Sequence, residues 1–195
     1  ALREEKTKLL AALPADGFAV VNFDNEDCRR SAKGLNAKII AYGLDERATV
    51  RAQEVRYSFD RGTDDLQGLS FKLTHASSFA PVLLPKVLGN AALSAALAAA
   101  AVGIAKGMNL IEIAEALKAF ESPPGRLKVI AGIKGTTIID DTYNAEPDST
   151  KAALDVLKLV PLPAGKYKYS VLGDMLELGT YSVAAHQNIG RIAEV

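Results

Sequence analysis

The sequence predicts an α/β fold in two domains. Short apolar runs that are typical of buried strands alternate with helical stretches over residues 1–42, as in parallel strands joined by crossovers. Two later apolar runs, residues 137–139 and 167–172, each end in a polar loop, the kind of loop that holds ligands in open α/β sheets. The stiff Ser-Pro-Pro-Gly segment at residues 122–125 separates the two parts.

The N-terminal part begins with a helix and strand alternation and continues with strands alone. Apolar and polar side chains alternate loosely over residues 50–59 and at period two over residues 69–73, and residues 79–84 read as a further strand, which together predict an antiparallel set at one edge of the sheet. Turn-forming residues at 60–65 interrupt this set. The helices expected before it span residues 1–13 and 27–33, and the expected strands span residues 18–21 and 38–42.

Two helices are predicted to complete the first domain. Residues 90–106 form an alanine-rich helical stretch that Gly107 ends, and so many alanines imply close packing against a neighbouring element. Asn109 is a candidate N-cap for a second helix, with Leu110, Ile113 and Leu117 on one face. The pair is expected to form an αα-hairpin.

The second domain is predicted to start directly after the proline-rich segment. We expect strands at 127–130 and 136–139, a helix at 151–160, a third strand at 167–172 and a last helix at 182–195. A doubly wound sheet usually has about five or six strands. We therefore expect the chain to be a fragment of a longer polypeptide.

Composition excludes several classes of function. The formal net charge is zero and basic residues are not clustered, which argues against nucleic acid or an anionic membrane as partner. The longest apolar stretch, residues 91–104, is shorter than the roughly 20 residues that span a bilayer. The single Cys28 fits a reducing compartment, and the two histidines and one cysteine have no zinc-ligand spacing. Neither a Gly-x-x-x-x-Gly-Lys-Ser/Thr phosphate loop nor a Gly-x-Gly-x-x-Gly string occurs.

The loop after residues 137–139 is the main candidate site. Asp140 and Asp141 end the expected strand, where a carboxylate can accept hydrogen bonds from a ribose diol or hold Mg²⁺ through water. The alternative is that the two carboxylates cap the following helix or are solvated. Arg126 follows the stiff linker, where it either reaches a phosphate on domain closure or is an ordinary surface arginine.

A second polar loop, residues 173–179, follows the expected third strand. Asp174 and Glu177 can hold a cationic amine or can be solvated. Met175 is apolar although it lies on a loop, and His186 in the last helix can hydrogen-bond back to that loop.

Three strings resemble the Mur ligases. They are Pro-Gly-Arg at 124–126, Asp-Asp-Thr-Tyr-Asn-Ala at 140–145, and Leu-Gly-Asp-Met-Leu-Glu-Leu-Gly at 172–179, followed by His186 and Gly190. The resemblance implies part of a P-loop-type central ATPase domain followed by a partial Rossmann-like C-terminal domain. Residues 1–123 would be the later part of the central domain and residues 124–195 the first part of the C-terminal one. The UDP-sugar domain and the phosphate loop would lie outside this chain.

The resemblance also implies a reaction, which is ATP-dependent amide formation through an acyl phosphate in peptidoglycan precursor synthesis. The last string points to the branch that joins D-Ala-D-Ala to UDP-N-acetylmuramoyl-tripeptide. ATP and Mg²⁺ are the implied cofactors, with the Mg²⁺ ligands outside this chain. A monomer in the cytoplasm is expected, without a nucleic acid or membrane partner, and the fragment alone is expected to be inactive.

Carried over to this sequence, the resemblance makes Asp141 the ribose ligand and brings Arg126 to the phosphates or the nucleotide when the domains close. Tyr143 and Asn144 would line the nucleotide face of the C-terminal domain. Asp174 and Glu177 would lie near the incoming dipeptide.

The sequence departs from the family pattern in two places. Residues 89–95 lack the histidine of the usual His-Asn-x-x-Asn-Ala string, so that only Asn90 remains for adenine, and Glu146 replaces the usual asparagine before Pro147. Two alternatives stay open, a non-catalytic two-domain α/β binding module and a sister Mur ligase with another amino acid. The string at 172–179 weighs against the sister ligase.

Overall fold

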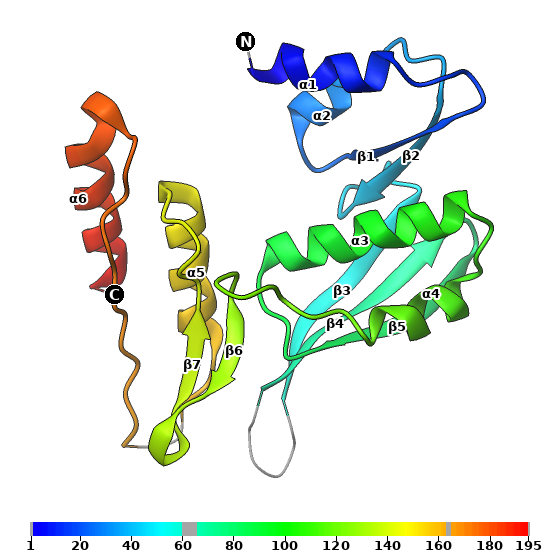
Figure 1. Cartoon of the computed structure of the whole chain (residues 1–195). Coiled ribbons are helices and arrows are strands. Elements are labelled where there is room, and N and C mark those ends of the chain that lie inside the picture. Colours follow the sequence, from blue (N-terminus) through cyan, green and yellow to red (C-terminus); the bar gives the residue numbers. More distant parts are fainter. Residues whose placement is uncertain (1, 60–65, 163–164, 195) are drawn as a thin grey trace. The chain divides into compact units, whose positions relative to one another are not determined.

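The computed structural model describes residues 2–59, 66–162 and 165–194 and is shown in Figure 1. The chain divides into two compact units. The first unit contains Ala1–Tyr57, Leu69–Pro85 and Ala91–Phe120, and the second contains Ser58–Gly68, Lys86–Asn90 and Glu121–Val195. Among the described residues, the helices are too short or too polar to cross a membrane.

The first unit is built on a five-stranded sheet in the order β1-β2-β3-β4-β5. Strands β1 and β2 are parallel, with Val20 opposite Ile40, and β2 is parallel to β3, with Tyr42 opposite Val50. The predicted crossovers are therefore confirmed, since α2 connects β1 to β2. The elements are α1 (Leu2–Ala11), β1 (Phe18–Asn22), α2 (Glu26–Ser31), β2 (Lys38–Gly43), β3 (Val50–Phe59), β4 (Leu66–His75) and β5 (Ser78–Pro85).

Strands β3, β4 and β5 form the predicted antiparallel set. His75 at the end of β4 bonds to Thr49 just before β3, whereas Ser70 bonds to Arg56 near the end of β3. Only antiparallel strands give this opposed order of partners. Strands β4 and β5 are joined by two residues, a connection that antiparallel strands alone allow. The turn-forming stretch 60–65 lies outside the described residues.

Helices α3 (Asn90–Ala105) and α4 (Leu110–Leu117) cover one face of this antiparallel set (Figure 1). A Cβ atom on Gly103 of α3 would lie 3.0 Å from the Ile113 side chain of α4, so the two helices pack as closely as the alanines predict. The face beneath them holds the core, to which alternate strand residues contribute: Val50 and Ala52 of β3, Leu69, Phe71 and Leu73 of β4, and Ala80, Val82 and Leu84 of β5. The fully buried large side chains of this unit are Val50, Leu73, Leu84 and Leu97.

Local chemistry sets the helix ends. Gly107 has a φ of +83°, which ends α3 in the left-handed conformation that glycine tolerates best. Asn109 caps α4 by accepting from the N–H groups of Ile111 and Glu112, while its own N–H donates to the Glu112 carboxylate. This capping box confirms the predicted cap.

The second unit contains a two-stranded sheet and two helices. Strands β6 (Lys128–Ala131) and β7 (Thr137–Asp140) are antiparallel, with Val129 opposite Ile139. Helices α5 (Pro147–Leu159) and α6 (Ser182–Ala193) pack together, and their core consists of Leu154, Met175 and Ile189.

The predicted third strand at residues 167–172 was wrong. This segment has no regular secondary structure, and Val171 is 97% exposed. Aromatic and β-branched residues favour a strand only where a neighbouring strand gives them a half-buried surface. No described strand pairs with this segment, so its strand preference is not satisfied. The predicted final helix is confirmed from Ser182 to Ala193, and Val195 lies outside the described residues.

Candidate functional site

Asp140, the last residue of β7, binds the linker that precedes β6. One carboxylate oxygen accepts from the Thr142 hydroxyl at 2.7 Å and from its backbone N–H at 3.2 Å. The other accepts from the backbone N–H of Gly125 at 3.1 Å. These bonds, first that from the Thr142 hydroxyl, lower the pKa of the Asp140 carboxyl. Both oxygens are therefore engaged in holding the backbone.

Asp141 keeps one oxygen available. Its Oδ1 accepts from the backbone N–H of Leu127 at 3.1 Å. Among the described residues, none donates to its Oδ2. The two adjacent carboxylates therefore differ, because Asp140 uses both oxygens internally and Asp141 uses one. The strand-end pattern alone did not distinguish Asp140 from Asp141; only the family resemblance singled out Asp141.

Arg126 lies between these two anchored positions. Its guanidinium carbon is 4.1 Å from the centroid of the exposed Tyr143 ring, a cation–π contact. The backbone N–H of Tyr143 donates to the Gly125 carbonyl at 3.2 Å. In the part of the chain that the structure describes, no carboxylate pairs with Arg126, so its guanidinium can still receive an anion.

Gly125 is required by this close approach. Its φ is +70°, and a Cβ atom there would lie 2.8 Å from the backbone nitrogen of Tyr143. Any larger residue would both strain its own backbone and push the Tyr143 loop away. The Pro-Gly-Arg string therefore has a local physical reason.

The start of α5 involves Asn144 and Glu146. The Asn144 amide donates to the Glu146 carboxylate at 3.1 Å, which leaves the Asn144 side-chain oxygen as an acceptor. Glu146, rather than Asp148 or Ser149, occupies the N-cap position, and its N–H donates to the Ser149 hydroxyl at 3.2 Å. Pro147 follows at the first helical turn, where its missing N–H costs nothing.

The second polar loop, residues 173–179, is held by Met175 and His186. Met175 is 3% exposed, and its N–H donates to Nε2 of His186 at 3.0 Å. Nδ1 of His186 donates to the Ser182 carbonyl at 2.8 Å, so this ring carries its proton on Nδ1. The predicted hydrogen bond from His186 back to the loop is confirmed.

Asp174 and Glu177 of this loop face solvent. The Asp174 side chain is 89% exposed, with Oδ1 4.0 Å from Nε2 of His186. Glu177 has a φ of +62°, an uncommon conformation for a non-glycine residue. Among the described residues, no hydrogen bond or ion pair joins these two residues to Arg126, Asp141 or Tyr143. The structure thus brings Arg126, Asp141 and Tyr143 together and leaves Asp174 and Glu177 outside their hydrogen-bonded group.

The described residues contain no group of three or more His, Cys, Asp or Glu side chains that could hold a metal ion. The Asp140–Asp141 pair binds backbone N–H groups instead.

Comparison with known proteins gives the family. The model of the Mur ligase middle domain matches residues 1–103, and the model of the Mur ligase, glutamate ligase domain, matches residues 125–195. The chain belongs to the Mur ligase family. The predicted resemblance and the α/β fold class are both confirmed.

Curated members of the Mur ligase family align with nearly all of the chain. The UDP-N-acetylmuramoyl-tripeptide–D-alanyl-D-alanine ligase of Mycobacterium bovis is 34% identical over 98% of this chain and 37% of its own length. The enzyme of the same name from Escherichia coli is 31% identical over 97% of this chain and 40% of its own length. The chain therefore spans about two fifths of these relatives.

Solved Mur ligase structures have the same fold. MurF from Acinetobacter baumannii is 28% identical, with a TM-score of 0.77 over 100% of this chain and 40% of that one. The MurF ligase of Thermotoga maritima, solved in complex with ADP, has a TM-score of 0.79 at 23% identity, over 98% of this chain and 41% of that one.

Proposed function

We propose that this chain is part of an ATP-dependent amide ligase that joins D-Ala-D-Ala to UDP-N-acetylmuramoyl-tripeptide in peptidoglycan precursor synthesis. The observation that carries the proposal is the identity of 31–34% over 97–98% of the chain with ligases of that name. We place the later part of the central domain in residues 1–123 and the first part of the C-terminal domain in residues 124–195. The fragment alone is expected to be inactive.

Asp141 is the proposed ribose ligand. Its Oδ2 has no described donor, whereas its Oδ1 is fixed by the Leu127 N–H, so the carboxylate is oriented before a ligand arrives. A carboxylate at a strand end that accepts from a ribose diol is a recurring feature of nucleotide sites. Asp140 differs, because both of its oxygens already accept hydrogen bonds from Gly125 and Thr142.

Arg126, Tyr143 and Asn144 form the rest of the proposed nucleotide face. Tyr143 supports the Arg126 guanidinium without neutralising it, because a cation–π contact leaves its N–H groups able to bind an oxyanion. The planar guanidinium can donate two parallel hydrogen bonds to a phosphate. The Asn144 side-chain oxygen can accept a hydrogen bond beside them, since its amide nitrogen already donates to Glu146.

Asp174 and Glu177 are proposed to lie near the ammonium group of the incoming dipeptide. Their exposure and negative charge support this role, and the anchoring of Met175 gives the loop a defined position. A carboxylate beside the amine would attract its charged form and orient it.

The chemistry that this chain lacks would come from outside it. ATP, when bound, supplies the phosphoryl group that activates the peptide carboxylate. The sequence contains no phosphate loop, and the described residues contain no group of metal ligands. We therefore propose that the phosphate loop and the Mg²⁺ ligands belong to other parts of the ligase. We further propose a cytoplasmic monomer that acts on small-molecule substrates without a nucleic acid or membrane partner.

Phosphate release by the full-length protein tests the proposed reaction. With ATP and Mg²⁺ present, release should require both UDP-N-acetylmuramoyl-tripeptide and D-Ala-D-Ala. Release that is equally fast without the dipeptide would contradict the proposal. Release that is supported by a different amino acid, and not by D-Ala-D-Ala, would indicate a sister Mur ligase.

A further inference from the structure

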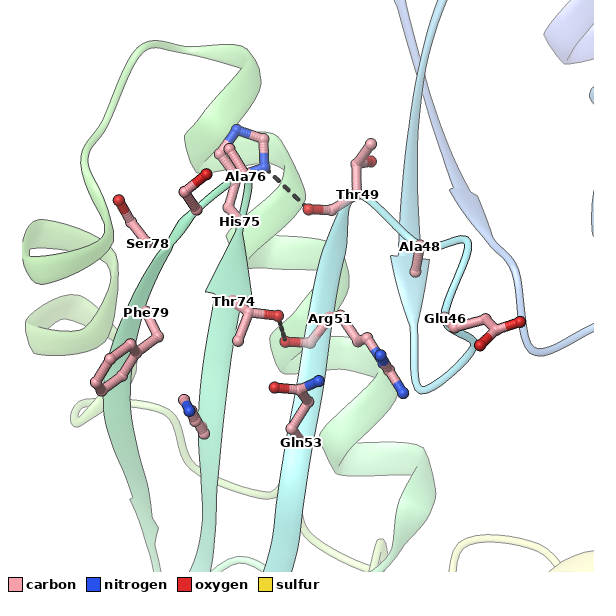
Figure 2. Close-up of a pocket in the computed structure, with 12 residues that line it drawn as sticks. Glu46, Ala48, Thr49, Arg51, Gln53, Thr74, His75, Ala76, Ser78 and Phe79 are labelled. Carbon is pink, nitrogen blue, oxygen red and sulfur yellow. Dashed lines mark hydrogen bonds between the residues drawn. The ribbon is translucent and has the colours of Figure 1, made fainter.

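A polar pocket of ≈ 560 Å³ lies on the face of β3, β4 and β5 that α3 and α4 do not cover (Figure 2). This volume is in the range of small-molecule sites, roughly 300–1,000 Å³. All of its lining residues belong to the first unit, whereas the proposed nucleotide-binding residues belong to the second. None of the residues that line the pocket is among the proposed nucleotide-binding residues.

Strand alternation explains why this face is polar. Ala52 of β3 and Leu73 of β4 are buried in the core under the helices. Arg51 and Gln53 of β3, and Lys72 of β4, are their sequence neighbours and therefore project to the opposite face. Figure 2 shows Arg51 and Gln53 along β3. The sheet thus presents two cations and an amide on an uncovered surface.

Arg51 is a guanidinium without a carboxylate partner. Its Nε donates to the Leu44 carbonyl at 2.9 Å, which orients the group, and no carboxylate of the described residues pairs with its remaining N–H groups. By contrast, Arg29 and Arg47 of the same unit pair with Asp45, and Arg30 pairs with Glu26. The Arg51 guanidinium is therefore oriented by one hydrogen bond, and its other N–H groups can donate to a ligand.

Lys72 provides a second cation at the same pocket. Its Nζ lies 4.3 Å from the ring centroid of Phe79, which is 63% exposed, and 4.0 Å from the Glu54 carboxylate, at the limit of an ion pair. The aromatic ring holds the ammonium group near the surface without using its hydrogen-bond donors. An exposed phenylalanine in this position also offers apolar area to a ligand.

The pocket walls are held by hydrogen bonds between strands. Thr74 donates from its hydroxyl to the Arg51 carbonyl at 3.2 Å, and His75 contacts the Thr49 carbonyl through Nδ1 at 2.9 Å (Figure 2). A carbonyl only accepts, so His75 carries its proton on Nδ1 and keeps Nε2 for other contacts. These two bonds join β4 to β3 beside the pocket.

We propose that this pocket binds a small ligand through one oxyanion group, a phosphate or a carboxylate, held by Arg51 and Lys72. An arginine fork and a nearby ammonium are the donors that such a group takes. The carboxylates of Glu46 at the pocket and Glu54 beside Lys72 equal the two cations in number, so the site has no net charge. This balance suits a compact anion with an uncharged remainder and disfavours a polyanion such as nucleic acid.

Amide chemical shifts of the ¹⁵N-labelled chain test the proposal, in separate titrations with inorganic phosphate and with acetate at constant ionic strength. Saturable shifts should be confined to residues 49–53 and 72–79. Arg51→Gln and Lys72→Gln should each weaken binding about tenfold, as expected for loss of a charge-assisted hydrogen bond. Lys38→Gln is the matched control, because Lys38 also lies over an aromatic ring, that of Phe18, at 5.6 Å, but outside the pocket.

The two titrations distinguish the source of the oxyanion. Saturable binding of phosphate alone would indicate a phosphate-bearing ligand, and saturable binding of acetate alone would indicate a carboxylate. Saturable binding of both would indicate a site that accepts either kind of oxyanion. Shifts spread over the surface, no saturation with either anion, or binding that Arg51→Gln and Lys72→Gln weaken no more than Lys38→Gln would overturn the proposal. None of these outcomes depends on the ligase activity.

Discussion

The Asp140 carboxylate accepts a hydrogen bond from the backbone N–H of Gly125 at 3.1 Å and so joins the end of β7 to the linker before β6. The neighbouring Asp141 makes the equivalent bond two residues further along, to the N–H of Leu127. Between the two bonds lies Arg126, whose guanidinium rests on Tyr143. The backbone of the candidate nucleotide-binding residues is thus fixed by two adjacent carboxylates.

Asp140→Asn should destabilise the second unit in a pH-dependent way. The amide nitrogen of asparagine cannot accept the bond that one carboxylate oxygen now accepts. Because the pKa of Asp140 is lowered below its ordinary 3.8 in the folded chain, its carboxylate stabilises the fold above that pH. The stability difference between wild type and variant should be full near neutral pH and should shrink as the pH falls through and below about 4.

Urea denaturation between pH 3 and 7, followed by amide signals of α5, α6 and β7, measures this difference. Asp155→Asn is a suitable control, because Asp155 makes only an exposed pair with Lys151. A difference for Asp140→Asn that is constant over this pH range would contradict the structural role.

Gly125→Ala should destabilise the chain more than Gly135→Ala. Both glycines have positive φ values, +70° and +73°, so both variants carry the strain of about 1–2 kcal/mol that a left-handed residue costs. Only at Gly125 would the new Cβ also lie 2.8 Å from a backbone nitrogen, whereas nothing lies within 4 Å of the Gly135 position. The excess should be about 1–3 kcal/mol in the free energy of unfolding. Equal losses would show that the Tyr143 loop can move aside freely.

Met175→Ala should lower the free energy of unfolding of the second unit by about 2–5 kcal/mol, the range for deleting a buried methionine side chain. Met175 packs with Leu154 and Ile189 although it belongs to a polar loop. The neighbouring Leu176 is 73% exposed, and Leu176→Ala should change stability by no more than about 0.5 kcal/mol. Similar effects of the two substitutions in chemical denaturation would contradict the anchoring role of Met175.

Local patterns predicted much of the fold. The alternation of strands and helices predicted β1, α2 and β2, and the period-two pattern predicted the antiparallel set. Asn109 predicted the start of α4. The hydrogen bond between His186 and the loop at 173–179 was also predicted, from the position of His186 in the last helix. These features depend on residues close together in the sequence or on one repeated pattern.

Features that depend on distant partners were not predicted. Residues 167–172 have the composition of a strand, but a strand also needs a neighbour, and none of the described strands supplies one. The different roles of Asp140 and Asp141 depend on N–H groups of residues 125 and 127, which the sequence does not place. The pocket around Arg51 was missed because its residues come from three strands and form no motif.

The assignment of ribose binding to Asp141 is tested most directly by the binding of ATP and 2′,3′-dideoxy-ATP to the full-length protein and its Asp141→Asn variant by calorimetry. If the free carboxylate oxygen holds the ribose hydroxyls, the substitution should weaken ATP binding about tenfold or more and leave dideoxy-ATP binding nearly unchanged. Asp140→Asn should not show this selectivity. An equal loss for both nucleotides in Asp141→Asn, or no loss for either, would contradict the assignment.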